Sequence, residues 1–400
     1  MQKKITICVA GKNDIAINVM SFLQKKNSQA NLVAIITKND TGLNGFFKSF
    51  LWYVEQQNIP VITLEEVYKI PDLIFLSVQF DKIIKPQLFV SKHLFNLHFS
   101  LLPAYKGMYP SAWPILNNEK FSGVTLHVLD RGIDTGDIIA QYKFKLDKNE
   151  TVNSLYKKYM LYGAKLMKQK IPLLIKKNYT ARPQPAEGST YYAGNSINYK
   201  NLIINVRVTA QQLDAQIRAF ASRQYQMPVV HNYKIHHTVI TKTKSTAGAG
   251  KLIMDDECYL IINTIDYNII LIKDVFNNFI LACRNNDLST IKNLIKYVDL
   301  EEQTLEGWTP LMIAAYNGAE DAMKYLLKQK ANVHAVNFKG TSVLMYAKDG
   351  ALKTGSNKLL DIILKARPDV AHKDMHNKNI FDYLAAQSPT LIAYISKKIK

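Results

Sequence analysis

The sequence predicts an α/β fold with a mostly parallel sheet, followed by a smaller β-rich domain and an α-helical repeat module. Three observations predict this order. Residues 1–180 alternate short apolar runs with amphipathic stretches, residues 181–275 are dominated by strand-like runs, and residues 276–400 repeat a motif at a fixed spacing. Alternating strand and helix patterns are typical of a parallel sheet with helices on both faces, so the first region is expected to be Rossmann-like.

The first region contains five apolar, β-branched runs that are short enough to be strands. These runs are Ile5–Ala10, Leu32–Thr37, Leu73–Val78, Leu94–Phe99 and Val124–Leu129. Asp14–Lys26 and Phe47–Gln57 predict amphipathic helices between strands, and Thr151–Lys177 predicts a long helix that closes the region. Ligands of such sheets bind at the carboxyl ends of the strands, so we expect a functional site there.

The second region predicts a small β-rich domain. It opens with the Pro- and Gly-rich connector ARPQPAEG and continues with a helical pattern at Ala210–Ser222. Strand-like runs follow at Val229–Thr241 and Lys251–Lys273, separated by the turn-prone stretch KTKSTAGAGK. A β-rich domain of this kind is a candidate surface for a homodimer.

The third region repeats with a period of 33 residues. Gly307 and Gly340 are 33 residues apart, and so are Leu311 and Leu344. The pattern G-x-TPL-x-x-A at this period resembles ankyrin repeats. One repeat cannot bury its helices alone, so we expect three to four repeats to stack, with atypical units at the ends.

Composition narrows the functional classes. The 400-residue chain has a formal net charge of +19, but the excess is mostly lysine and is spread along the chain, which argues against a nucleic-acid partner. Cys8, Cys258 and Cys283 are isolated and form neither a disulfide framework nor a zinc motif. No run approaches the roughly 18 apolar residues of a membrane helix. We expect a cytoplasmic protein without a membrane partner or a metal.

A polar pair follows the fourth predicted strand. Asn96 and His98 are two residues apart, so their side chains share one face of the strand, and SLLP then ends it at the carboxyl edge. Asp134 lies in RGIDTGDI, where a solvated turn would explain an acid taken alone. Together these residues form a constellation without a serine or cysteine nucleophile. That combination suits direct acyl transfer between two bound substrates.

The pattern N-x-H-x-SLLP-x-x-x-G, with Asp-Thr-Gly farther along, resembles that of folate-dependent formyltransferases over residues 1 to about 180. This resemblance implies N10-formyltetrahydrofolate as the formyl donor, and Asn96, His98 and Asp134 as catalytic residues. The family holds the pterin partly through backbone groups, and the matching segments are Phe80–Ile84 and Asp130–Asp134. The residues expected at the cofactor are Phe80, Lys82, Ile84, Asp130 and Gly132.

The expected roles follow from the chemistry of amine formylation. Asn96 donates a hydrogen bond to the oxygen of the tetrahedral intermediate. His98 takes the proton that the amine loses or stabilises the oxyanion, and Asp134 orients His98 and relays protons towards the folate nitrogen. The sequence leaves open which proton transfer His98 dominates.

The segments AYKGMYPSAWPI, ARPQPAEGSTYYAGNSI and IRAFASRQYQMP resemble the branch that formylates dTDP-linked amino sugars, some members of which carry C-terminal ankyrin repeats. This branch implies a dTDP-linked 3-amino- or 4-amino-6-deoxyhexose as the acceptor, and a role in surface polysaccharide (O-antigen, lipopolysaccharide) synthesis. A thymine ring needs an aromatic partner and a pyrophosphate needs cations. The residues expected at the acceptor are Tyr109, Tyr192, Arg218 and Tyr225, with Arg223 as a further cation.

Other functions stay open. The alternatives are a methionyl-tRNA formyltransferase, a purine-pathway formyltransferase, and an inactive formyltransferase domain that serves as an ankyrin interaction protein. For the repeats, the default expectation is a protein partner or structural support. The sharper hypothesis is a second nucleotide-sugar stacked on Trp308, which follows Gly307 at a hairpin tip.

Overall fold

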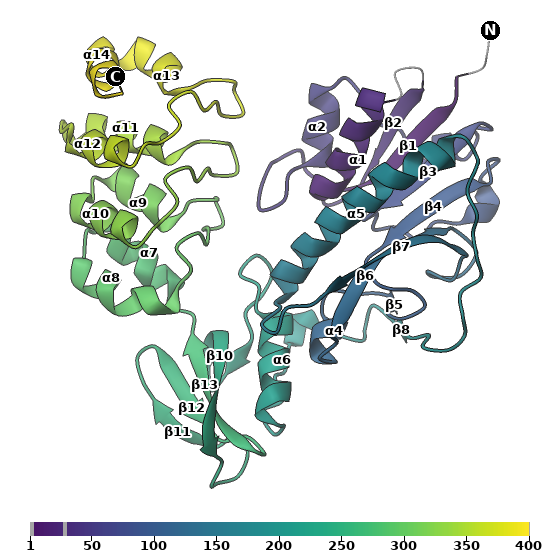
Figure 1. The fold of residues 1–400 in the computed structure, drawn as a ribbon, viewed down its shortest axis with the longest axis horizontal. Coiled ribbons are helices and arrows are strands. Elements are labelled where there is room, and N and C mark those ends of the chain that lie inside the picture. The colour runs from purple at the N-terminus through teal and green to yellow at the C-terminus, as the bar shows by residue number, and fades with distance from the viewer. Residues whose placement is uncertain (1–3, 27–29, 400) are drawn as a thin grey trace. The chain divides into compact units, whose positions relative to one another are not determined.

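The computed structural model describes residues 4–26 and 30–399, and it divides the chain into two compact units (Figure 1). Unit 1 consists of residues 1–43, 47–255 and 260–271, and unit 2 consists of residues 44–46, 256–259 and 272–400. The first two predicted regions therefore lie almost entirely in unit 1, and the predicted repeats lie in unit 2.

Within the described residues, the centre of unit 1 is a six-stranded sheet with the order β2-β1-β3-β4-β6-β7 (Figure 1). Its strands are β1 (Thr6–Gly11), β2 (Asn31–Ile36), β3 (Leu73–Val78), β4 (His93–His98), β6 (Phe121–Val128) and β7 (Ile138–Lys145). β1 to β4 are parallel, whereas β6 and β7 each run antiparallel to the preceding strand in this order. The predicted mostly parallel α/β sheet is confirmed. β7 was not predicted, because lysines and half-exposed positions interrupt its apolar pattern.

Different elements cover the two faces of this sheet. Ile7 and Val9 of β1 pack into the cluster that contains the buried side chains of α1 and α5. Cys8 packs on the opposite face, in the cluster that contains Val67 of α3. A parallel strand buried on both faces needs a near-continuous apolar run, which is why these strands could be predicted. The helical elements are α1 (Asn13–Lys26), α2 (Phe50–Gln56), α3 (Leu64–Val67), η1 (Pro86–Leu88), α4 (Trp113–Leu116) and α5 (Val152–Ile175).

The rest of unit 1 contains a separate sheet, whose described strands have the order β11-β12-β13-β10-β9, and α6 packs against β10. A short parallel pair of strands joins the connector after residue 181 to the loop that follows β4. The elements are β5 (Lys106–Gly107), β8 (Tyr191–Tyr192), η2 (Tyr199–Asn201), α6 (Ala210–Phe220), β9 (Val229–Val230), β10 (Tyr233–Lys244), β11 (Leu252–Asp255), β12 (Tyr259–Ile262) and β13 (Tyr267–Lys273).

Unit 2 is built from pairs of helices, as the repeat predicted. Thr309 and Ser342, which occupy the same repeat position, cap α9 and α11 by accepting a hydrogen bond from a backbone N–H. Gly307 and Gly340 have φ of +87° and +77°, respectively, in the turns that precede these caps. The elements are α7 (Phe276–Arg284), α8 (Leu288–Leu294), η3 (Ile295–Tyr297), α9 (Pro310–Asn317), α10 (Glu320–Lys328), α11 (Val343–Thr354), α12 (Lys358–Lys365), α13 (Ile380–Gln387) and α14 (Pro389–Lys398).

In the described part of the chain, no helix combines the length and the apolar character needed to cross a lipid bilayer. The 24-residue α5 is long enough but carries lysines along its exposed side.

Candidate active site

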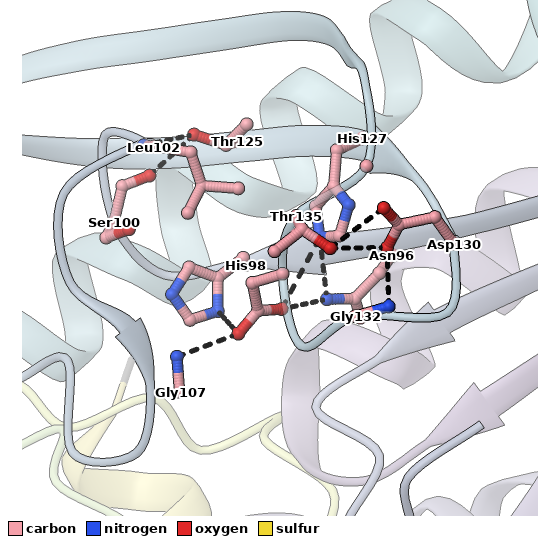
Figure 2. Close-up of polar contacts among 12 residues, drawn as sticks. Asn96, His98, Ser100, Leu102, Gly107, Thr125, His127, Asp130, Gly132 and Thr135 are labelled. Carbon is pink, nitrogen blue, oxygen red and sulfur yellow. Dashed lines mark hydrogen bonds and ion pairs between the residues drawn. The ribbon is translucent and has the colours of Figure 1, made fainter. Parts of the chain in front are cut away.

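The polar pair of β4 lies at the carboxyl end of the strand, with both side chains on the same side of the sheet (Figure 2). His98 is 7% exposed, and Asn96 is half-buried. The antiparallel register between β4 and β6 places Asn96 directly opposite His127. Three polar side chains therefore meet at this edge of the sheet.

The carboxylate of Asp134 lies between these side chains. Its Oδ2 accepts a hydrogen bond from the backbone N–H of Gly107 at 2.9 Å and lies 3.4 Å from Nδ1 of His98. Its Oδ1 accepts from Nδ2 of Asn96 at 3.2 Å and lies 3.5 Å from Nε2 of His127. We call Asn96, His98, His127 and Asp134 the Asp134 cluster. The structure thus brings together the three residues expected to be catalytic.

Asp134 is held as a carboxylate. Burial by itself would raise its pKa, but the positive charge of His98 when that ring is protonated and the N–H of Gly107 stabilise the carboxylate and lower the pKa to about 2. The turn that carries it is organised by Asp130, whose Oδ1 accepts from Gly132 N at 3.2 Å and from Thr135 Oγ1 at 2.7 Å. The cluster therefore contains a fixed negative charge.

The contacts of His98 leave one of its ring nitrogens able to accept a proton. Burial lowers its pKa, although Asp134 and the Tyr105 carbonyl raise it in part, so the ring is neutral at pH 7. Its Nε2 lies 2.7 Å from the carbonyl oxygen of Tyr105, and a carbonyl only accepts, so Nε2 carries the proton of the neutral ring. Nδ1 then presents a lone pair beside Asp134. A proton that arrives at Nδ1 would be stabilised by the adjacent carboxylate.

His127 was not among the residues expected at the site. Its Nδ1 donates to the carbonyl oxygen of Val128 at 2.8 Å, so its Nε2 is free to accept the hydrogen bond from Asn96 at 3.1 Å. The signal in the sequence is a histidine inside the apolar run Val124–Leu129. Its pairing with Asn96 depends on the β4–β6 register, which the sequence does not display.

The amide of Asn96 is fully used as a donor. One N–H of Nδ2 is directed at Asp134 and the other at His127. The expected donation from Asn96 to an oxyanion therefore requires one of these two contacts to be released. Because Nδ2 of Asn96 contacts both Asp134 and His127, the orientation of the amide group is fixed, and with it the position of its Oδ1.

The loop after β4 is tied down by one hydroxyl. Thr125 Oγ1 donates to the carbonyl oxygen of Ser100 at 2.7 Å and accepts from Leu102 N at 3.1 Å (Figure 2). It also accepts from Gln141 Nε2 at 3.0 Å. A hydroxyl can make one donor and two acceptor contacts, so Thr125 is saturated. The SLLP segment is in this way fixed beside the Asp134 cluster.

Both the sequence and the fold of this chain are similar to those of known formyltransferases. The family described as Formyl transferase matches residues 62–171, and Ankyrin repeats (3 copies) match residues 279–374. WlaRD, a sugar 3N-formyl transferase whose structure was determined in the presence of dTDP and 5-N-formyl-THF, is 41% identical, with a TM-score of 0.63. The alignment covers 68% of this chain and 98% of WlaRD. The chain belongs to the folate-dependent sugar N-formyltransferase family.

A second solved formyltransferase is equally similar. The N-formyltransferase from Helicobacter canadensis, in complex with folinic acid and dTDP-3-aminofucose, is 41% identical, with a TM-score of 0.62 over 67% of this chain and 99% of that one. The curated relatives are matched over less of their length. Methionyl-tRNA formyltransferase from Clostridioides difficile (strain 630) is 30% identical over 212 residues, which are 51% of this chain and 66% of the relative. The bifunctional polymyxin resistance protein ArnA from Wigglesworthia glossinidia brevipalpis is 36% identical over 124 residues, only 19% of its length.

The segments expected at the folate of this formyltransferase lie beside the cluster. Asp130 and Gly132 belong to the turn that carries Asp134, and the segment Phe80–Ile84 follows β3, the parallel neighbour of β4. Ile84 is 8% exposed and packs in the apolar cluster under the sheet, so its side chain serves the core. Phe80 packs against the same cluster, and Lys82 is exposed. Binding of the pterin by these segments stays a prediction.

The three aromatic residues expected at the acceptor differ in their contacts and in their exposure to solvent. Tyr109 donates its hydroxyl to the Gly194 carbonyl at 2.7 Å, and Tyr192 is stacked on Trp113 with ring centroids 4.0 Å apart. Tyr225 is 69% exposed and presents its ring to solvent. A role of these rings in binding the acceptor stays a prediction.

Arg218 is engaged within the protein. It is 8% exposed, its Nε donates to Asp214 at 2.7 Å, and one terminal nitrogen donates to the Glu150 carbonyl at 2.9 Å. These contacts anchor α6 to the segment before α5. A pyrophosphate would have to compete with Asp214 for this guanidinium, so its expected role at the acceptor also stays a prediction.

Trp308 of unit 2 is half-buried in an aromatic group. Its ring centroid lies 4.2 Å from that of Tyr346 and 5.3 Å from that of Tyr316. Separately, among the residues that the structure describes, no group of three or more His, Cys, Asp or Glu side chains is placed to hold a metal ion.

Proposed function

We propose that this formyltransferase moves the formyl group of N10-formyltetrahydrofolate onto the primary amine of a dTDP-linked 3-amino-6-deoxyhexose, with the 4-amino isomer as the next candidate. The observation that carries the proposal is the Asp134 cluster, which combines a neutral base, a carboxylate and an oriented amide without a nucleophile. The preference for the 3-amine is supported by WlaRD and the Helicobacter canadensis enzyme, which are described as a sugar 3N-formyl transferase and as a complex with dTDP-3-aminofucose.

The formyl-folate supplies an activated one-carbon acyl group when it is bound. In the transfer, a bond forms between the acceptor amine and the formyl carbon, and the bond from that carbon to the folate N10 breaks. The amine loses one proton and N10 gains one, so the reaction balances without an oxidant or a reductant. The chain's own residues must therefore bind, orient and move a single proton.

The neutral His98 ring is the proposed proton acceptor. Asp134 stabilises the imidazolium that results, since its carboxylate lies 3.4 Å from Nδ1. Positioned acid–base groups of this kind supply about 10²–10⁴ in rate. Asn96, oriented by His127, is proposed to bind the reacting amine or the developing oxyanion, which requires one of its present contacts to be exchanged for substrate.

The test is a panel of dTDP-linked amino sugars incubated with formyl-folate and analysed by product mass. We expect one member, with its amine at C3, to gain the mass of one CO group. The His98→Gln variant is the control and should form little product. If no sugar is formylated by the wild-type protein, the proposed acceptor is wrong.

The second candidate is formylation of methionyl-tRNA, which is favoured by the curated relative from Clostridioides difficile. It is tested in the same assay with charged initiator tRNA as the acceptor. Formyl-methionine in the absence of formylated sugar would select this candidate. The sugar is preferred, because the relatives with the higher identity are matched over nearly their whole length.

For the ankyrin unit, we propose either a protein partner, which is the default for such repeats, or a second nucleotide-sugar bound at Trp308. The support for the nucleotide-sugar is an aromatic group of three rings, which offers stacking surface for a base. Calorimetry with the dTDP-sugar should show two sites per chain for the wild type and one for Trp308→Ala. Equal stoichiometry in the two proteins would leave the protein partner as the better hypothesis.

The remaining proposals concern cellular context. We propose a cytoplasmic enzyme of surface polysaccharide (O-antigen) synthesis, in agreement with buried, unpaired cysteines and with a nucleotide-linked acceptor. We also propose a homodimer formed through the second sheet. Light scattering measures the oligomeric state, and loss of the formylated sugar from the surface glycan of a deletion strain tests the cellular role.

A further inference from the structure

Gln184 lies in the Pro- and Gly-rich connector that follows the first predicted region, outside the four residues of the Asp134 cluster. Its Nε2 donates to the carbonyl oxygens of Asp134 and Gly136, each at 2.8 Å. We propose that Gln184 is a positioning residue, which holds Asp134 in the conformation that the cluster needs. This inference rests on the proposed function, because it assigns a role in that reaction.

The backbone of Asp134 explains why such a residue is needed. Asp134 has a φ of +55°, in the left-handed region that non-glycine residues rarely occupy. With φ negative, its carboxylate would point elsewhere and lose the N–H of Gly107 and the neighbouring Nδ1 of His98. The two bonds from Gln184 grip the carbonyl of Asp134 itself and that of Gly136, on either side of Thr135. They therefore restrain the peptide groups that follow Asp134, and with them the shape of the turn that keeps Asp134 in this conformation.

Hydrogen bonds fix the connector both before and after Gln184. Before Gln184, Arg182 exchanges two backbone hydrogen bonds with Ile138, at 2.8 and 3.0 Å. After it, Thr190 Oγ1 accepts from Tyr105 N at 2.7 Å, and its carbonyl accepts from Lys106 N at 3.0 Å. The connector therefore contacts both the turn that carries Asp134 and the loop whose Tyr105 carbonyl contacts His98.

The side-chain oxygen of Gln184, Oε1, makes no hydrogen bond in the described structure, so the polar contacts of this side chain come from its N–H groups. This oxygen is buried. A buried acceptor without a partner opposes folding, so this side chain is not an optimised packing element. What it adds to the structure is the pair of N–H donors aimed at the turn.

The test compares Gln184→Met and Gln184→Glu with the wild-type chain. Methionine has a similar shape without donors, and glutamate places an oxygen against the two carbonyls. We expect kcat to fall about 10–100-fold in Gln184→Met, the range found for residues that orient active-site ligands, and further in Gln184→Glu. KM for both substrates should change less than about threefold, because Gln184 is not expected to touch either of them.

The matched control is Gln216→Met. Gln216 also donates from Nε2 to a backbone carbonyl, that of Asn205 at 3.0 Å, but it lies on α6. We expect it to retain wild-type kcat. Equal falls in kcat for Gln184→Met and Gln216→Met, or a rise in KM at constant kcat, would overturn the proposal.

A second measurement does not depend on turnover. NMR titration of labelled histidines, with the His98 signal assigned by its loss in His98→Gln, reports the pKa of His98 directly. Asp134 raises that pKa, so release of Asp134 in Gln184→Met should lower it, whereas Gln216→Met should leave it unchanged. An unchanged titration in Gln184→Met refutes the positioning role. If the wild type formylates no acceptor, the proposed function fails, and the titration still decides the role of Gln184.

Discussion

The turn of Asp134 and the hairpin turns of the ankyrin unit both need positive φ, but they fill these positions differently. The turns before α9 and α11 use Gly307 and Gly340. Around the Asp134 cluster, Gly107 has a φ of +86°, but the non-glycine residues Tyr105, Tyr109 and Asp134 also have positive φ, of +61°, +61° and +55°. A left-handed non-glycine residue costs about 1 kcal/mol or more. Positive φ is not reserved for glycine in the ankyrin unit, since Asn377 has a φ of +58°. At Asp134, glycine would remove the carboxylate that joins the cluster, so this turn accepts the cost of a side chain that the site needs.

The largest expected effect is at Asp134. Asp134→Asn preserves the size of the side chain and removes its charge, so we expect kcat to fall about 10²–10⁴-fold. Asp137→Asn is the matched control, because this exposed carboxylate lies in the same turn. Steady-state rates of formyl transfer measure both variants. If Asp134→Asn keeps more than half of the wild-type kcat, the negative charge of Asp134 is not needed for catalysis, and the positive φ of its turn has another explanation.

A smaller loss is expected at His127. His127→Phe removes the acceptor that orients the Asn96 amide, and we expect kcat to fall about 10–100-fold. His127→Gln, which can offer an oxygen to the same amide, should recover part of that loss. The two variants are compared by their kcat and by their thermal midpoints. Equal activity in both would show that His127 contributes only packing.

The pH dependence of kcat/KM tests whether the neutral form of His98, beside the turn of Asp134, is the proton acceptor. His98 must be neutral to accept a proton, so activity is full above its pKa and is lost as pH falls through it. Burial lowers that pKa below the ordinary 6.5, so the acid limb should lie below pH 6.5, with a roughly tenfold loss per pH unit. Because Asp134 raises this pKa, the limb of Asp134→Asn should shift to lower pH. A limb that moves upward in that variant would contradict the assignment of His98 as the base.

The smallest effect on catalysis is expected in the ankyrin unit. Gly340→Ala places a Cβ at a φ of +77° and 3.1 Å from Cα of Asp374, so it should destabilise unit 2 by about 1–2 kcal/mol. Formyl transfer should be unchanged. Gly248→Ala, where nothing lies within 4 Å of the added Cβ, is the control. Thermal unfolding that is equally unaffected in both variants would show that the repeat turns do not depend on glycine.

The sequence predicted the elements whose pattern is local. Parallel strands buried on both faces read as apolar runs, and the period of two along β4 predicted that Asn96 and His98 share a face. The ankyrin repeats were predicted by the period of 33 residues together with the motif G-x-TPL-x-x-A, which resembles that family. β7 was missed, because a half-exposed edge strand with lysines has no such run.

The rest of the cluster depends on contacts that the sequence does not display. His127 reaches Asn96 through the register of two antiparallel strands. Gln184 lies in a segment whose prolines and glycine indicate only a connector, and its two bonds to the turn of Asp134 arise from tertiary structure. Asp134 itself was predicted with the help of a family resemblance, because its turn alone would indicate a solvated loop.

The β5–β8 pairing has a consequence for the biosynthesis of the enzyme. Lys106 and Gly107 pair with Tyr191 and Tyr192, and Tyr109 bonds to the carbonyl of Gly194. A nascent chain that has emerged only as far as residue 180 contains all strands of the main sheet, but it lacks β8, which pairs with the loop that carries the Tyr105 carbonyl. We therefore expect the smallest fragment with full formyl-transfer activity to extend past Gly194, so that the newly made protein gains this activity after its main sheet has emerged.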